Sequence, residues 1–241
     1  FEFATYIDEY FLGAFMEKGK ALERLKRYEE AIESYNRTIE LDDPTSYALL
    51  RIGKSYEKLG NKVEALKYFN KTVHEDPLLD KGWIAITDFY VRQKNYQKAL
   101  FYVNKAIAID DQNRAYWKRY ATINKAMNFF EEAEHGYRKA VEFGDTQLDT
   151  WLFWVDVLQF LGEFESAIQT LLQASEFFPD DYQIEYRLAG LYFTQTEDKK
   201  ATFHLSNALR LNFKNRTILE DLFPAVWNLK KVQNYIKKYD I

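Results

Sequence analysis

Histidines and carboxylates are the residues of this chain that could do acid–base chemistry or bind a metal ion. His74, His135 and His204 lie far apart in the sequence, and none has a second ligand-type residue at helical spacing that completes a metal-binding set. There is no cysteine, which excludes thiolate metal sites, thiol nucleophiles and disulfides. The sequence also contains no glycine-rich phosphate loop and no nucleophile elbow. We therefore predict no enzyme activity, no cofactor and no bound metal.

Pairs of adjacent aspartates are the arrangement closest to a catalytic carboxylate pair. Asp42-Asp43, Asp110-Asp111 and Asp180-Asp181 each stand where one helical hairpin is expected to end and the next to begin. An aspartate at the start of a helix accepts hydrogen bonds from the free N–H groups of the first turn. This position favours helix capping over acid–base catalysis.

The overall composition indicates which type of secondary structure carries these residues. Glycine (9) and proline (4) are scarce in the 241 residues, which favours helices joined by short loops over a turn-rich β fold. The net charge of −4 provides no general attraction to nucleic acid or to an anionic membrane. No apolar run reaches the ~18 residues that span a bilayer, and no signal peptide is visible. We leave the localisation unassigned, and only these absences and the lack of cysteine favour the cytoplasm.

A strict repeat runs through most of the chain. An alanine recurs every 34 residues, a bulky residue follows it by four positions, and a second small residue follows it by seven. This spacing places all three on one face of a helix, where the small residues allow a close helix–helix contact. The alanines are Ala31, Ala65, Ala99, Ala133, Ala167 and Ala201; the bulky residues are Tyr35, Phe69, Val103, Tyr137, Leu171 and Leu205; the second small residues are Thr38, Thr72, Ala106, Ala140, Ala174 and Ala208.

An earlier apolar stripe in each unit predicts a first helix that pairs with this second one. Its members include Leu49, Trp83, Trp117 and Trp151, followed three residues later by Ile52, Ile86, Tyr120 and Trp154. Tight turns are expected between the two helices, as at Leu59-Gly60-Asn61 and Leu161-Gly162-Glu163. Each unit is thus a helix–turn–helix hairpin.

The repeat resembles the tetratricopeptide repeat. The fullest match is the unit 46–79, with Gly53, Tyr56, Gly60, Ala65, Phe69 and Pro77; other units depart from it, as where Thr87 and Val155 replace the small glycine. The resemblance implies an all-α fold, a right-handed α-solenoid of stacked 34-residue helix–turn–helix repeats. It also implies that the first helices line a concave groove that holds a protein or peptide.

The register divides the chain into six repeats and two flanking segments. The repeats are expected at 12–45, 46–79, 80–113, 114–147, 148–181 and 182–215. We interpret residues 1–11 as the second helix of a preceding repeat or as an N-terminal cap; a missing repeat before them would expose apolar surface and favour self-association. Residues 216–241 are expected to form capping helices that Pro224 interrupts. There Val226, Leu229, Val232 and Ile236 should face inward and Lys230, Lys231, Lys237 and Lys238 outward.

The resemblance assigns particular residues to the groove. Its first four repeats should be mainly basic, with Lys20, Arg24, Lys54, Lys58, Lys81, Arg92, Lys118 and Lys125, and with Arg51 one position away. Its last two repeats should be apolar and aromatic, with Leu152, Asp156, Phe160, Tyr186 and Phe193. We predict a partner segment that carries acidic residues and an apolar anchor, because charge would orient it and the anchor would supply affinity.

Several alternatives remain open. The groove charges could simply be solvated and compensated by Glu23, Glu57 and Asp88. The family's clamp for a C-terminal carboxylate is not met, since Lys118 and Thr122 come nearest but Phe153 stands where the next asparagine is needed. The chain could instead be a structural assembly module that oligomerises through its repeat ends or convex face. RNA binding is a third alternative, although the acidic net charge leads us to expect no nucleic-acid partner. We expect no membrane insertion in this segment.

Overall fold

The computed structural model describes residues 12–41 and 45–239. All regular secondary structure within these ranges is helical, so the all-α prediction is confirmed. The expectations for residues 1–11 and for Asp42-Asp43 lie outside the described residues. The paired helices are α2 (Leu12–Arg24), α3 (Tyr28–Leu41), α4 (Ser46–Lys58), α5 (Lys62–Glu75), α6 (Asp80–Arg92), α7 (Tyr96–Ile109), α8 (Arg114–Ala126), α9 (Phe130–Glu142), α10 (Leu148–Phe160), α11 (Phe164–Phe177), α12 (Tyr182–Thr194) and α13 (Asp198–Asn212).

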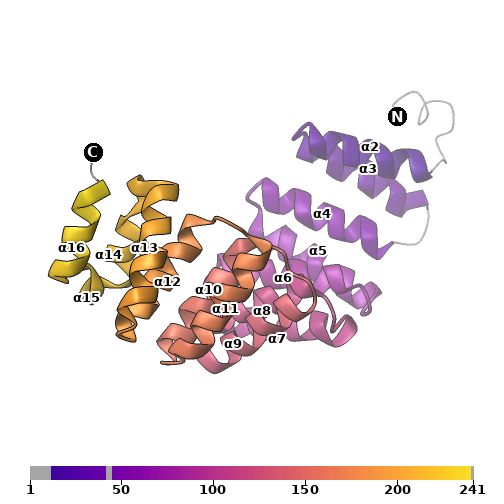
Figure 1. The fold of residues 1–241 in the computed structure, drawn as a ribbon. Helices are drawn as coiled ribbons and strands as arrows, with labels where there is room; N and C mark the ends of the chain where they lie inside the picture. Colours follow the sequence, from indigo (N-terminus) through magenta and orange to yellow (C-terminus); the bar gives the residue numbers. More distant parts are fainter. Residues whose placement is uncertain (1–11, 42–44, 240–241) are drawn as a thin grey trace. The chain divides into compact units, whose positions relative to one another are not determined.

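The chain forms two compact units, which we call unit 1 (1–127) and unit 2 (128–241). Within unit 1 the helices from α2 to α8 pack in sequence order, each beside the one before it (Figure 1). Within unit 2 the same order runs from α9 through α13. Even-numbered helices up to α12 are the first helices of the hairpins, and odd-numbered helices up to α13 are the second helices.

The repeated small and large residues form the contacts between helices. All six repeat alanines, Ala31, Ala65, Ala99, Ala133, Ala167 and Ala201, are fully buried. The large residues that follow them, from Tyr35 to Leu205, are at most 1% exposed, and the second small residues at most 5%. A helix that presents small residues allows its neighbour to approach closely, and the large side chain fills the adjacent groove. The predicted packing face of the second helices is confirmed.

The turn inside each hairpin has one geometry, repeated six times. The same position of every turn has a positive φ between 56° and 79°, and two of the six residues are glycine: Lys26, Gly60, Lys94, Asn128, Gly162 and Thr196. In five of these turns the next residue donates its N–H to a carbonyl in the last turn of the first helix, as Asn61 does to Tyr56 at 2.9 Å. This closing bond satisfies a carbonyl that the helix end leaves free.

Helix capping explains only part of the aspartate pattern. Asp181 is the N-cap of α12, and its side chain accepts hydrogen bonds from the N–H groups of Gln183 and Ile184. The prediction is therefore confirmed for Asp181. Helix α8 is capped by Asn113 instead, and Asp110 accepts a hydrogen bond from the Asn113 amide at 3.0 Å.

The C-terminal segment folds into three short helices, α14 (Thr217–Leu222), α15 (Pro224–Trp227) and α16 (Lys230–Ile236), flanked by the 3₁₀ turns Phe213–Asn215 and Lys237–Tyr239. Pro224 is the first residue of α15, so it interrupts the helix as predicted. Val226, Val232 and Ile236 are buried. The prediction was wrong for Leu229, which is 37% exposed because it caps the start of α16 instead of lying inside a continuous helix.

Candidate functional site

The first helices of unit 1 carry the predicted groove residues on the side that we call the inner face. Arg24 on α2, Lys54 and Lys58 on α4, and Lys81 on α6 are solvent exposed. Within the part of unit 1 that the structure describes, none of these four cations pairs with a carboxylate. They are therefore available to a ligand with negative charge.

Two arginines of the same surface, Arg51 and Arg92, are paired, an alternative that the sequence left open. Arg51 on α4 pairs with Glu23 on α2 at 3.0 Å, and Arg92 on α6 pairs with Glu57 on α4. Each pair joins the first helices of adjacent hairpins. The alternative of compensation applies to Arg51 and Arg92, because a carboxylate of the preceding repeat neutralises each guanidinium.

A third pair extends this arrangement in unit 1. Arg119 on α8 donates from Nε to the Asp88 carboxylate on α6 at 2.8 Å. In unit 2, Arg187 on α12 pairs in the same way with Asp156 on α10 at 3.3 Å. Both arginines lie 31 residues after their partners, slightly less than one repeat. That spacing is a sequence signal for pairing that the sequence analysis did not use.

Lys54 has two cationic neighbours, Arg51 and Lys81. Although the side chain of Lys54 is exposed, partial desolvation by the surrounding protein lowers its pKa, the Arg51 charge lowers it further, and Lys81 acts in the same direction. Glu23 and Asp88 oppose these effects without cancelling them. A lysine whose charged form is disfavoured gains from an incoming anion, so this part of the inner face is suited to acidic groups.

An aromatic ring lies beside this cluster. Tyr47 on α4 is 39% exposed, with Lys20 Nζ 5.5 Å and Arg51 Cζ 5.8 Å from its ring centroid. Lys20 also pairs with Glu17 at 2.6 Å, so it is less available than Lys54. Lys118 and Lys125 lie on α8 and are partly buried.

The structure corrects the predicted aromatic part of the groove in unit 2. Leu152, Tyr186 and Phe193 are 4%, 0% and 7% exposed, and all belong to the apolar core of that unit. They cannot offer an open binding surface in this state, since their own chain covers them. Phe160 is 68% exposed and stacks on Phe130 with ring centroids 3.8 Å apart, so it is the one aromatic residue of the predicted set that the structure leaves accessible among its described residues.

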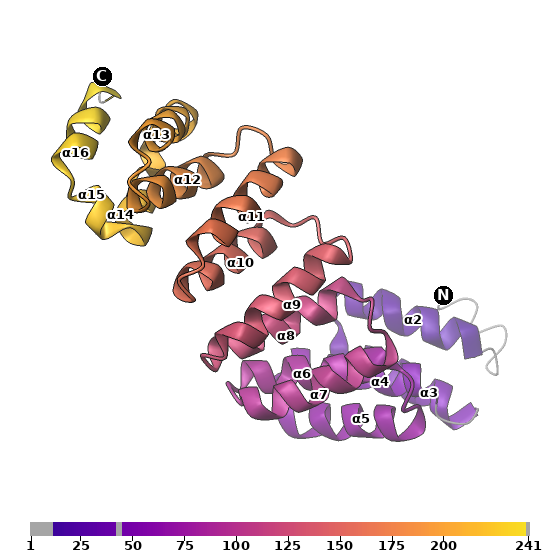
Figure 2. The same cartoon turned by 60° about the horizontal axis from the view of Figure 1, so that its bottom comes forward.

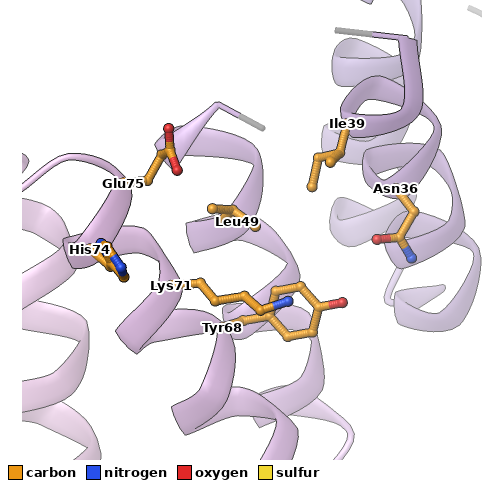
Figure 3. A pocket seen from close by; sticks show the side chains of 7 residues that line it. All are labelled: Asn36, Ile39, Leu49, Tyr68, Lys71, His74 and Glu75. Atoms are coloured by element: carbon orange, nitrogen blue, oxygen red, sulfur yellow. The ribbon is translucent and has the colours of Figure 1, made fainter. Parts of the chain in front are cut away.

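A separate depression lies among α3, α4 and α5 of unit 1 (Figure 3). It has a volume of about 330 Å³ and is lined by Asn36 and Ile39 of α3, Leu49 of α4, and Tyr68, Lys71, His74 and Glu75 of α5. The Lys71 side chain lies over the Tyr68 ring, with Nζ 5.0 Å from its centroid. Because Lys71, His74 and Glu75 are all solvent exposed, this is an open depression and not an enclosed ligand site.

The described ranges, 12–41 and 45–239, contain no group of three or more histidine, cysteine, aspartate or glutamate side chains placed to hold a metal ion. No helix in them combines the length and the apolar character needed to cross a membrane.

Comparisons with known proteins agree with the hairpin repeat. Family models described as tetratricopeptide repeat match residues 16–80 and 81–113. Residues 16–113 therefore consist of tetratricopeptide repeats, a type of repeat found in protein-interaction scaffolds. A search among curated proteins gave no match.

Solved structures share the fold. YrrB, reported as a TPR protein with an unusual peptide-binding site, is similar with a TM-score of 0.67 and 16% identity over 79% of this chain and 98% of its own. PilF of Pseudomonas aeruginosa has a TM-score of 0.64 and 14% identity over 96% and 98% of the two chains. The C-terminal part of a TPR protein from Cytophaga hutchinsonii has a TM-score of 0.74 and 16% identity over 90% of each. At these identities the likeness establishes the fold alone.

Proposed function

We propose that this chain is a non-catalytic scaffold that binds an acidic segment of a partner protein on the inner face of unit 1. The observation that carries the proposal is a set of exposed cations on three successive first helices that pair with no carboxylate among the described residues of unit 1: Arg24, Lys54, Lys58 and Lys81. Neighbouring first helices place these charges along one surface, so an extended or helical segment could contact several at once. YrrB, which has the same fold, is reported to have a peptide-binding site, and this supports the class of ligand.

The paired arginines support a division of roles on this surface. Because Glu23, Glu57 and Asp88 already neutralise Arg51, Arg92 and Arg119, the arginines hold adjacent repeats together. Arg24 and the lysines remain to attract the ligand. Their flexible side chains and exposed charge favour orientation and fast association over tight binding, and Tyr47 provides an adjacent ring for apolar contact. Binding should therefore weaken as the salt concentration rises.

The test compares two charge reversals with the same change in net charge. The inner-face variant carries Lys54→Glu, Lys58→Glu and Lys81→Glu. The control variant carries Lys71→Glu, Lys98→Glu and Lys105→Glu, which are exposed lysines on the second helices α5 and α7 of the same unit. A fluorescein-labelled decapeptide of glutamates with one central phenylalanine is titrated against each protein, and binding is followed by fluorescence anisotropy.

We expect the inner-face variant to lose affinity by about tenfold or more, since three exposed charge contacts become repulsive. The control variant should bind as the wild type does. Equal losses in both variants would mean that the peptide senses only net charge and would refute the proposed site. Circular dichroism of both variants checks that their helix content is unchanged.

A further inference from the structure

The inner face of α12 differs from those of the first helices of unit 1 in what covers it. Its inward positions hold Tyr186, Gly190 and Phe193, and all three are buried. The positions equivalent to Gly190 in unit 1 hold Lys20, Lys54, Asp88 and Thr122, of which Lys54 and Thr122 are exposed and Lys20 and Asp88 partly buried. In unit 2 the surface is closed by the chain's own C-terminal segment, whose helices α14, α15 and α16 lie beside α12 and α13 (Figure 2).

The contacts show how the segment is seated. The Phe223 ring lies against Gly190, where a Cβ atom would come closer than 3.0 Å to three ring atoms. The Tyr186 hydroxyl donates to the Asn212 carbonyl at 2.9 Å, at the point where the chain leaves α13. Further along, Lys231 Nζ lies 5.4 Å from the Phe193 ring centroid. The same ammonium donates to both carboxylate oxygens of Asp198, at 2.5 and 2.6 Å.

The segment does not continue the repeat. In the preceding hairpins of unit 2 a first helix packs on the second helix before it, as α12 packs on α11. Helix α14 instead packs chiefly on α12, the first helix of the last hairpin. It therefore lies on the side where earlier repeats keep an open inner face.

Gly190 is the residue that makes room for the aromatic ring. A glycine in the middle of a helix costs stability, because it loses more chain entropy on folding than alanine. Its presence at an inward position of α12 is explained by the ring that it accommodates. The surface is thus shaped for an aromatic side chain that approaches the helix backbone.

We propose that the inner face of α12 is a binding site for an aromatic side chain on a short helical segment of a partner, and that residues 217–236 occupy it when no partner is bound. The seated segment defines the chemistry of that partner. It carries a phenylalanine with aliphatic neighbours, followed by a cation that contacts the Phe193 ring and the Asp198 carboxylate. This ligand is chemically distinct from the acidic segment expected on unit 1, and the site lies wholly in unit 2.

The seated segment has the properties of a replaceable occupant. Helices α14, α15 and α16 have 6, 4 and 7 residues. An isolated helix shorter than about 12 residues is marginal in water, so the order of these helices depends on docking. Elements of this kind open as one cooperative unit, at a free energy below that of global unfolding. A competing segment needs only that opening and not the unfolding of α12 and α13.

The test uses the full chain and a labelled synthetic peptide. A Phe223→Ala variant weakens the internal occupant but leaves the inner face of α12 unchanged. The probe is a fluorescein-labelled peptide with the sequence of residues 216–237, and the control peptide has alanine in place of its phenylalanine. We expect the variant to bind the probe at least tenfold more tightly than the wild type does, and to bind the control peptide at least tenfold more weakly than the probe.

Three results would overturn the proposal. The first is a Phe223→Ala chain that binds neither peptide, and the second is one that binds both equally. The third is loss of hydrogen-exchange protection in α12 and α13 together with α14 to α16, which would make the segment an inseparable part of the core. Selective loss of protection in α14 to α16 supports it. Concentration-dependent dimers of the wild type in sedimentation would assign the surface to the segment of a second copy instead.

Discussion

The buried hydroxyl of Tyr186 makes the stability of unit 2 sensitive to alkaline pH. Burial raises the pKa of Tyr186 from 10.0 to about 12, because the phenolate would lose its hydration in the apolar core. A raised folded-state pKa contributes stability that is complete below pH 10 and is lost as the pH rises toward 12. The full contribution is about 2.7 kcal/mol, of which about 1 kcal/mol disappears between pH 10 and 11.

The measurement is urea unfolding of wild type and Tyr186→Phe at pH 8, 9, 10 and 11, followed by tryptophan fluorescence. The variant loses the 2.9 Å hydrogen bond to Asn212, which should cost about 1 kcal/mol at every pH. It also lacks the titrating group, so wild type and variant should converge by about 1 kcal/mol between pH 10 and 11. Tyr35 and Tyr116, whose pKa values burial also raises, are present in both proteins and cancel in the difference. A difference that stays constant with pH would refute the assigned burial of Tyr186.

Three further sets of substitutions test the packing, the turns and the ion pairs. Ala133→Leu places a large side chain at a fully buried helix contact and should destabilise unit 2 by roughly 1–3 kcal/mol in thermal unfolding; an unchanged melting curve would contradict the assigned contact. Thr196→Gly should stabilise the protein by about 1 kcal/mol, because a β-branched residue is strained at φ 60°, and Gly162→Thr should cost a similar amount in the same denaturation assay. Glu23→Gln should cost about 1.5–3 kcal/mol, and a double-mutant cycle with Arg51→Met should remove most of that cost; additive losses would argue against the pair.

Features that depend on the period could be predicted from the sequence. Every repeat alanine from Ala31 to Ala201 is buried, because a side chain's direction on a helix follows from its spacing and six copies average out local exceptions. The conformation of the turns follows the 34-residue period even where the residue type does not indicate it. Gly60 and Gly162 identified two of them, and the same positive φ occurs at Lys26, Lys94 and Thr196, where the residue type gives no hint. Projecting the glycines by the repeat length would have located all of these turns.

Features that depend on pairing between repeats could be predicted only in part. A groove assignment tells which side a lysine or arginine faces, but not whether a carboxylate of the neighbouring repeat reaches it. Lys54 and Arg51 lie on the same helix with the same formal charge, and only Arg51 meets Glu23. The planar guanidinium of Arg51 donates to Glu23 while its own Cζ lies 5.8 Å from the Tyr47 ring centroid. The outcome depends on side-chain reach across adjacent helices.

The burial of the aromatic residues of α12 could not be predicted from the repeat. Tyr186 and Phe193 occupy inward positions as the register requires, yet they are buried because the segment after α13 turns onto α12. Residues 216–241 have no counterpart in the repeat, so the period contains no information about where they dock. In a repeat array every first helix has an equivalent inner face. The segment that follows the last repeat determines which of these faces is covered. The apolar character that suggested an anchor site in the sequence is therefore the same property that attracts the chain's own Phe223, and the two interpretations differ only in which segment occupies the surface.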